Sequence, residues 1–193
     1  KSLFLNPHLI RSENALKPYC RFEVTKNFIE IIKKVALEFC IFNDDINTRN
    51  KNAALILLPR LTAGRSEFIN DIRCIVEMLD ELGWTIFLKS HPLDEKVYET
   101  LEVKTRFELL PSNMPAEVIP GIYDCIKLII GKETTSLMSI KSLFPELQTI
   151  NLIEERAITT KYQNAMIKAG VNSAEPSILK EKLLSWSQLI QNS

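Results

Sequence analysis

The segment Trp84-Thr85-Ile86-Phe87-Leu88-Lys89-Ser90-His91-Pro92 decides the fold class of this chain. Its first five residues are apolar or β-branched, a pattern typical of a buried β-strand. The strand gives way to a polar turn in which Lys89 and His91 stand two residues apart before Pro92. In an open α/β sheet, ligands bind beyond the carboxyl ends of the strands. Two cationic donors at such an edge would hold an anion, most economically a phosphate.

On either side of this segment, short apolar runs alternate with stretches of helical periodicity. The expected strands lie at 53–58, 84–88, around 106–110, 126–130 and 148–152. The expected helices lie at 66–82, 94–102, from Met114, from Thr134, at about 155–169 and at 177–191. This alternation predicts parallel strands joined by right-handed helical crossovers, an α/β fold with a Rossmann-like, doubly wound sheet.

The first 52 residues differ from the rest. They contain one amphipathic helix, with Phe28, Ile32, Val35 and Phe39 on one face. The polar and charged run 43–52 has the composition of a linker. We therefore expect an N-terminal helical segment and linker at 1–52, and a Rossmann-like domain at 53–193.

Composition excludes several classes of function. Lys and Arg number 24, as do Asp and Glu, and this balance argues against a nucleic-acid-binding module, which should be basic. The four cysteines form no CxxC pair or Cys/His cluster, so no zinc site is expected. No GxGxxG motif supports NAD or FAD binding. No apolar run approaches the roughly 18 residues of a membrane span, and no signal peptide is visible.

Two further loops follow expected strands and bring different polar groups. Glu117 stands in the first turn of the helix from Met114, where a carboxylate complements the helix dipole or accepts the hydroxyls of a ribose. Thr134, Thr135 and Ser136 set three hydroxyls at a helix start. One hydroxyl suffices for an N-cap, and three beside exposed N–H groups make a neutral cradle for a phosphate. The loop with Lys89 and His91 also has an ordinary structural explanation, a surface lysine beside a histidine that caps a turn.

The three loops together resemble a known family. Lys-x-His-Pro at 89–92 is followed by Pro-x-Glu at 115–117 and by a Ser/Thr pair that begins at Thr134. His91 and Glu117 are 26 residues apart, and Glu117 and Thr134 are 17 apart. This ordered set resembles the donor-binding half of bacterial sialyltransferases with two Rossmann domains (GT-B), the group of lipooligosaccharide sialyltransferases and capsular polysialyltransferases. The resemblance covers roughly residues 53–170.

The resemblance implies a nucleotide-sugar-binding domain for CMP-sialic acid that needs no metal or other cofactor. His91 would contact the phosphate and stabilise or protonate the departing CMP. Lys89 and Pro92 would lie beside the nucleotide, with Lys89 near the cytidine. Glu117 would bind the ribose hydroxyls.

The phosphate would accept hydrogen bonds from the helix start. The resemblance assigns this role to Thr134 and Thr135, and Ser136 is the alternative to Thr135 for the second position. Serines are frequent here in the family, and a threonine keeps the hydroxyl donor that the phosphate needs.

The catalytic base implied by the resemblance is missing from this sequence. In the family it comes from an Asp/Glu-Asp/Glu-Gly motif in the N-terminal Rossmann domain, whereas Asp44-Asp45 is followed by Ile46 and no acidic pair precedes a glycine. The chain also opens on Lys1 rather than on methionine. We therefore expect a C-terminal portion of a larger transferase, inactive alone, whose missing domain would hold most of the glycan acceptor. Such a transferase would be cytoplasmic, at the inner face of the bacterial membrane.

Two other classes of function fit the same pattern. One is a different GT-B glycosyltransferase or a sugar-nucleotide epimerase, which would keep the architecture and change the donor. The other is a non-catalytic Rossmann-like binding module in which Glu117 and Thr134 are ordinary helix caps. A preference for cytidine nucleotides would separate the sialyltransferase from both.

Overall fold

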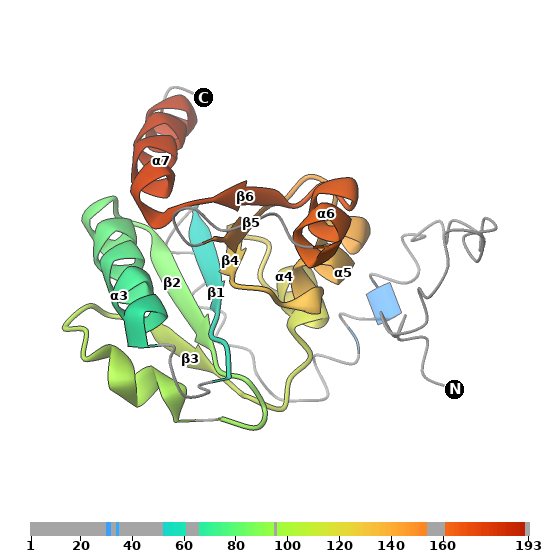
Figure 1. The fold of residues 1–193 in the computed structure, drawn as a ribbon, viewed down its shortest axis with the longest axis horizontal. Coiled ribbons are helices and arrows are strands. Elements are labelled where there is room, and N and C mark those ends of the chain that lie inside the picture. Colours follow the sequence, from blue (N-terminus) through green and yellow to red (C-terminus); the bar gives the residue numbers. More distant parts are fainter. Residues whose placement is uncertain are drawn as a thin grey trace.

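The computed structural model describes residues 52–60, 66–94, 96–153 and 161–191, together with 30, 31 and 34. In these ranges, six parallel strands form one sheet in the order β3-β2-β1-β4-β5-β6 (Figure 1). This is the strand order of a doubly wound Rossmann sheet, so the expected fold class is confirmed. The helix expected around Phe28 to Phe39 and the linker expected at 43–52 lie almost wholly outside the described residues.

The bounds of the elements follow the apolar runs of the sequence closely. The strands are β1 (Ala53–Leu57), β2 (Thr85–Lys89), β3 (Glu108–Leu110), β4 (Ile126–Gly131), β5 (Gln148–Leu152) and β6 (Asn172–Ala174). The α-helices are α3 (Ser66–Glu81), α4 (Ile119–Ile122), α5 (Thr135–Leu143), α6 (Lys161–Lys168) and α7 (Pro176–Gln191), and two 3-10 helices are η3 (Val97–Leu101) and η4 (Ala116–Val118). None of the described helices combines the length and the apolar character that crossing a membrane requires.

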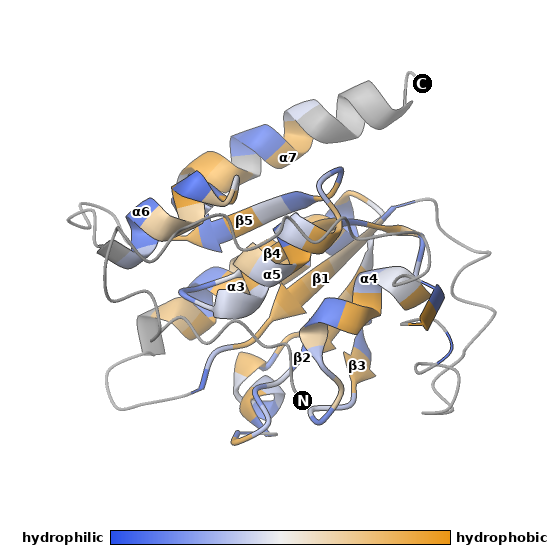
Figure 2. Cartoon of the chain, turned by 90° about the vertical axis from the view of Figure 1, so that its right-hand side faces the viewer, coloured by the Kyte–Doolittle hydropathy of each residue, from blue (hydrophilic) through white to orange (hydrophobic). Residues whose placement is uncertain are grey.

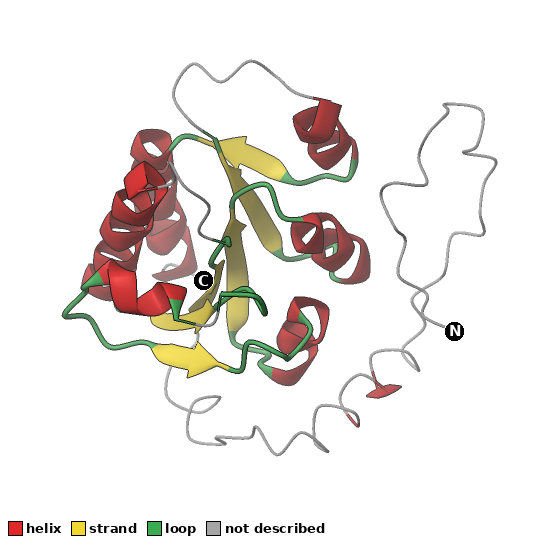
Figure 3. Cartoon of the chain, turned by 60° about the horizontal axis from the view of Figure 1, so that its bottom comes forward, coloured by secondary structure: helices red, strands yellow, loops and turns green. Residues whose placement is uncertain are grey.

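Helices cover both faces of the sheet (Figure 3). One core lies under α3, η3 and α7, and the other lies under α4, α5 and α6. Because successive side chains of a strand point to opposite faces, β1 gives Ala54 and Ile56 to the first core and Leu55 and Leu57 to the second. Figure 2 shows β1 as a wholly apolar strand in the middle of the sheet. The sheet is thus buried on both sides, and its polar loops gather at its ends.

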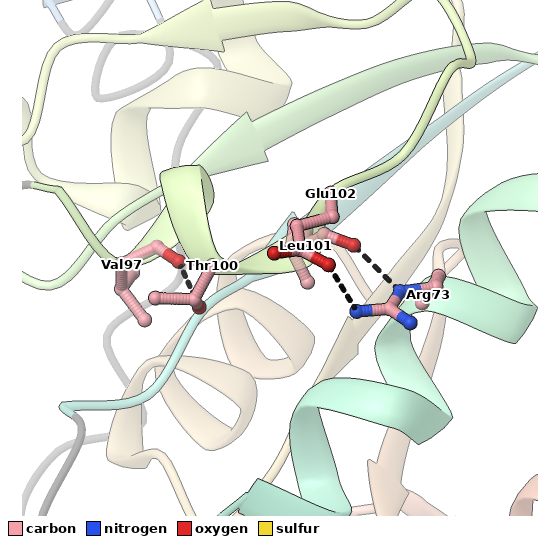
Figure 4. Close-up of polar contacts among 5 residues, drawn as sticks. All are labelled: Arg73, Val97, Thr100, Leu101 and Glu102. Atoms are coloured by element: carbon pink, nitrogen blue, oxygen red, sulfur yellow. Dashed lines mark hydrogen bonds and ion pairs between the residues drawn. The ribbon is translucent and has the colours of Figure 1, made fainter.

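Helix α3 also fixes the connection between β2 and β3. The Arg73 side chain donates a hydrogen bond from Nε to the carbonyl oxygen of Leu101 at 2.6 Å, and its Nη2 lies 3.7 Å from Oε2 of Glu102 (Figure 4). Within η3, the Thr100 hydroxyl donates to the carbonyl oxygen of Val97 at 2.6 Å. These contacts anchor the end of η3 to the helix that precedes β2.

Three elements differ from the expectation. The helix expected from Met114 is two short pieces, η4 and α4, because Pro120 has no N–H to continue the hydrogen-bond ladder. Pro115 stands before the first helical residue rather than on it, since its backbone is extended (ψ 131°). The helix expected at 94–102 is the shorter η3, and β6 is a strand that the apolar pattern did not indicate.

Candidate functional site

A single row of residues crosses the carboxyl edge of the sheet. The strand register pairs neighbours across all six strands in the order Leu110, Lys89, Leu57, Gly131, Asn151 and Ser173. Paired residues of parallel strands point to the same face, here the face that α4, α5 and α6 cover. The loops that carry His91, Glu117 and Thr134 leave the sheet just beyond this row. The structure therefore brings the three predicted loops to one edge of the sheet.

Lys89 ties two of these loops together. Its side chain is 6% exposed, and Nζ donates hydrogen bonds to the carbonyl oxygens of Ser90 at 3.2 Å and Ser112 at 3.0 Å. Burial lowers the pKa of Lys89, and the charge of Glu117 raises it in part. The ammonium group thus joins the loop after β2 to the loop after β3, within electrostatic reach of Glu117.

His91 begins a tight turn whose geometry selects its tautomer. The Asp94 N–H donates to the His91 carbonyl oxygen at 2.9 Å, and the Leu93 N–H donates to the ring nitrogen Nδ1 at 3.1 Å. A neutral ring that accepts at Nδ1 carries its hydrogen on Nε2. The expected turn-capping role is therefore real, but it occupies one nitrogen and leaves Nε2–H of a partly exposed ring as a donor. Pro92 is exposed at the corner of this turn.

Glu117 lies in η4, and its side chain is partly exposed. It stands in the first turn of η4, which leads directly into α4, and a carboxylate there complements the helix dipole. Its charge also reaches Lys89, whose pKa it raises in part. The structure is thus compatible with both explanations of Glu117.

Thr134 occupies the N-cap position of α5 without capping it. Its backbone is extended, with φ −105° and ψ 131°, but its hydroxyl makes no capping hydrogen bond. The Leu137 N–H donates to the main-chain carbonyl of Thr134 at 3.2 Å. Of the other two predicted hydroxyl residues, Thr135 is exposed and Ser136 is partly exposed. The start of α5 thus presents hydroxyls that the helix itself does not use as caps.

Gly131 allows this loop to return close to the sheet. A Cβ on Gly131 would lie 2.9 Å from Cγ2 of Thr134 and 3.4 Å from Cβ of Leu57. Real Cβ atoms do not make the shorter of these contacts, so the methyl group of Thr134 uses the space that the glycine leaves. A side chain at position 131 would move Thr134.

Asn151 is a site residue that the sequence analysis missed. It is fully buried in β5 beside Gly131, and its Oδ1 accepts a hydrogen bond from the Glu133 N–H at 2.8 Å. Glu133 adopts the left-handed backbone region with φ 48°. An asparagine inside the apolar strand 148–152 was the available signal, because asparagine is depleted in strands.

A separate hollow lies at the opposite edge of the sheet. It measures about 580 Å³, is mostly apolar, and is lined by residues at the amino ends of β4 and β5, among them Ile126, Lys127, Leu147 and Gln148. Ligands of doubly wound sheets bind at the carboxyl edge instead. We therefore assign the candidate site to the carboxyl edge.

The fold and this edge define a Rossmann-like α/β protein with its polar loops where that class binds ligands. More particularly, the chain belongs to the alpha-2,8-polysialyltransferase family, whose family model matches residues 2–154. The resemblance to polysialyltransferases is thereby confirmed. The match begins in the N-terminal segment and ends after β5, whereas we expected the resemblance to cover 53–170.

One solved structure supports the fold. A glycosyl transferase family 9 protein from Veillonella parvula is similar with a TM-score of 0.51 and 13% identity, over 84% of this chain and 52% of that one. A putative NADPH:quinone reductase from Bacillus thuringiensis is similar with a TM-score of 0.38 and 14% identity, over 85% and 51%. The chain spans about half the length of these structures. No curated protein matches the sequence.

Proposed function

We propose that this chain is the donor-binding part of a sialyltransferase and holds CMP-sialic acid at the carboxyl edge of its sheet. The observation that carries this proposal is the convergence of His91, Glu117 and Thr134 just beyond β2, β3 and β4. Membership of the polysialyltransferase family supports the class of donor. Each of the three side chains suits one part of CMP: His91 the leaving oxygen, Glu117 the ribose and Thr134 the phosphate.

The start of α5 receives the phosphate. The N-terminal N–H groups of a helix bind anions through hydrogen bonds and through the helix dipole. Thr134 adds a hydroxyl that does not cap the helix. The second hydroxyl comes from Thr135 or Ser136, both of which are at least partly exposed.

His91 assists the departure of CMP. Sialyl transfer breaks the bond between the anomeric carbon and a phosphate oxygen, so negative charge develops on that oxygen. A donor aimed at the developing charge lowers the barrier, and the Nε2–H of His91 is such a donor, given the hydrogen bond that Nδ1 accepts from Leu93. Because Nδ1 accepts a hydrogen bond, the ring is neutral, and His91 stabilises the departing CMP by donating a hydrogen bond and keeping its proton. Protonation of CMP by His91 would require the imidazolium form, in which Nδ1–H could not accept from the Leu93 N–H.

Glu117 and Lys89 hold the nucleoside end. The Glu117 carboxylate accepts hydrogen bonds from the two ribose hydroxyls, as acidic residues do in other nucleotide-binding folds. Lys89 lies near the cytidine and acts mainly through the loops, because its Nζ already donates to the carbonyls of Ser90 and Ser112. It thereby fixes the distance between the His91 turn and Glu117.

The catalytic base and most of the acceptor site belong to a second Rossmann domain in a GT-B arrangement. No acidic pair precedes a glycine in the sequence, and a base is needed to take the proton of the acceptor hydroxyl. This chain alone should bind CMP and CMP-sialic acid weakly and transfer no sialic acid. The complete transferase would act on surface glycans from the inner face of the bacterial membrane.

Titration calorimetry with CMP, UMP and GDP tests the proposal. We expect CMP to bind best of the three nucleotides. His91→Ala should weaken CMP binding about tenfold, because it removes a hydrogen bond to a charged group. Leu93→Ala is the matched control, since this exposed side chain stands in the same turn and its backbone N–H is retained. Absence of binding by every nucleotide at millimolar concentration would refute a donor site, and preference for UMP or GDP would assign a different donor.

A further inference from the structure

We propose that Asn151 is the positioning residue of the phosphate loop, defined here as residues 131–134 between β4 and α5. Its Oδ1 holds the Glu133 amide and thereby sets the place of Thr134 and of the first amides of α5. This inference rests on the proposed donor function, in which that loop receives the phosphate. Asn151 itself touches no part of the donor in this proposal.

The position of Asn151 in the sheet brings it to the loop. It is paired in register with Gly131 on β4 and with Ser173 on β6, on the face that α5 and α6 cover. Its side chain is 0% exposed. From there Oδ1 accepts the Glu133 N–H at 2.8 Å, across a separation of 18 residues in the chain. The bond therefore joins the phosphate loop to a buried residue of the neighbouring strand rather than to another loop.

The loop needs such a bond because of its backbone. Glu133 has φ 48°, a region that residues other than glycine visit uncommonly and at an energetic cost. The side chain of Glu133 is exposed, so packing of that side chain does not hold the conformation. The main-chain N–H bonded to Asn151 does. Without it, the loop would relax toward commoner backbone angles and carry Thr134 with it.

The polar side chain of Asn151 destabilises the core in which it is buried, and this supports a specific role for it. Its Nδ2 is buried without a hydrogen-bond partner among the described residues, and a buried unpartnered donor is destabilising. A leucine, which has the same branched outline and no polar atoms, would suit the apolar surroundings of β5 better if burial were the only requirement. The polar residue is explained by the single bond that its oxygen makes.

Thr149 supplies a matched control on the same strand. It lies two residues before Asn151, on the same face of β5, and is likewise 0% exposed. Its hydroxyl oxygen is also buried without a hydrogen-bond partner among the described residues. It makes no hydrogen bond to the phosphate loop. Thr149→Val keeps the shape and removes the hydroxyl, so it reports on changes to the core that leave the loop alone.

The test compares CMP with cytidine, which lacks the phosphate, as ligands of the 193-residue chain. In Asn151→Leu we expect the dissociation constant of CMP to rise about tenfold, in line with the loss of one hydrogen bond that orders the site. The dissociation constant of cytidine should change less than about twofold, because no cytidine contact is lost. Thr149→Val should bind both ligands as the parent chain does. An unchanged ratio of the two constants in Asn151→Leu would overturn the proposal, because a merely structural role affects both ligands alike.

Hydrogen exchange of the Glu133 amide separates this inference from the proposed function. Exchange should be faster in Asn151→Leu than in the parent and Thr149→Val, whether or not nucleotide binds. Equal exchange in all three would show that Asn151 does not hold the loop. If the parent chain binds no CMP, the donor site is wrong while the exchange still decides the role of Asn151 in the loop.

A second variant covers a failure of Asn151→Leu to fold. Asn151→Ser places in β5 the residue that β6 already carries at the paired position 173, and its side chain is too short to replace the bond to Glu133. The same expectations for CMP, cytidine and amide exchange apply to it. A Ser variant with the parent's ratio of CMP to cytidine affinity would refute the proposal in the same way.

Discussion

At the scale of single residues, the structure is most informative where a polar side chain does not use all of its hydrogen-bonding groups within the fold. Thr134 has the position and backbone of an N-cap, yet its hydroxyl makes no capping hydrogen bond. His91 does cap a turn, but with only one of its two ring nitrogens. In both residues, a donor remains for something outside the fold.

This observation gives a prediction for Thr134→Val. A working N-cap contributes about 1 kcal/mol to stability, whereas this replacement should change the free energy of unfolding by less than about 0.5 kcal/mol. The affinity for CMP should fall about tenfold because a phosphate ligand is lost. Urea denaturation and calorimetry measure the two quantities. Thr135→Val and Ser136→Ala, measured in the same way, identify the residue that supplies the second hydroxyl of the site. If Thr134→Val lost stability but kept its CMP affinity, Thr134 would be an ordinary helix cap.

The site residues show what sequence reasoning can reach at this scale. His91, Glu117 and Thr134 could be selected because each follows an apolar strand, and strand ends are visible in the sequence. Asn151 could not be linked to Glu133, because they are 18 residues apart and meet only through the pairing of β4 with β5. The nucleotide contacts of the selected residues remain predictions.

At the scale of elements, the connection from β4 to α5 is the tightest part of the site. Gly131 lies under the methyl group of Thr134, and the next residues turn through the left-handed conformation of Glu133. A short connection of this kind has few alternative conformations. It can therefore hold amides and hydroxyls in place before any ligand arrives.

Gly131→Ala tests this connection. The new Cβ would meet Cγ2 of Thr134 at 2.9 Å, so the Thr134 side chain or the loop must shift, at a cost of about 1–3 kcal/mol. Because either shift displaces Thr134, CMP affinity should fall. Gly83→Ala is the control, because Gly83 follows the end of α3, far along the chain from this loop. Its positive φ of 74° makes an alanine strained by about 1 kcal/mol, but a Cβ at this position would have no atom within 4 Å. Equal CMP affinity in both variants would show that the loop tolerates displacement.

The elements themselves were predictable to different degrees. β5 has the bounds expected from its sequence, and β1 and β4 differ by one residue at an end, because long apolar runs bounded by polar residues define buried strands well. β6 was missed because Asn172 and Ser173 have low strand propensity. It is a strand only because β5 offers an unpaired edge. In place of the single helix expected from Met114 there are two pieces, because Pro120 cannot donate to the hydrogen-bond ladder.

At the scale of the whole molecule, pH changes the balance between folded and unfolded chains through buried groups. Burial raises the pKa of Tyr162 from 10.0 to about 12, and the nearby Glu133 adds to the increase. The folded state therefore favours the neutral phenol. This contribution to stability is fully present below pH 10 and is lost as the pH rises through about 12.

We expect the parent chain to lose stability relative to Tyr162→Phe as the pH rises above 10, because the unfolded tyrosine then ionises before the folded one. Urea denaturation below and above pH 10 measures this difference, and other alkaline titrations cancel because both chains share them. The ultraviolet absorbance of the phenolate gives the pKa directly. Glu133→Gln should reverse only part of the increase in the Tyr162 pKa, since burial is the larger cause. If the stability of the parent chain and that of Tyr162→Phe depended on pH in the same way, the phenol would not be desolvated in the folded state.

The short outer strands of the sheet bear on solubility. β3 and β6 have three residues each, and β3 places the charged Glu108 next to the exposed Leu109. An unpaired strand edge is a template on which another chain can add a strand, and short or charged edges limit such growth. The strongly apolar centre of this sheet is thus bordered by short strands, which limit such growth. Lengthening β3 with alternating valines should therefore promote association between chains.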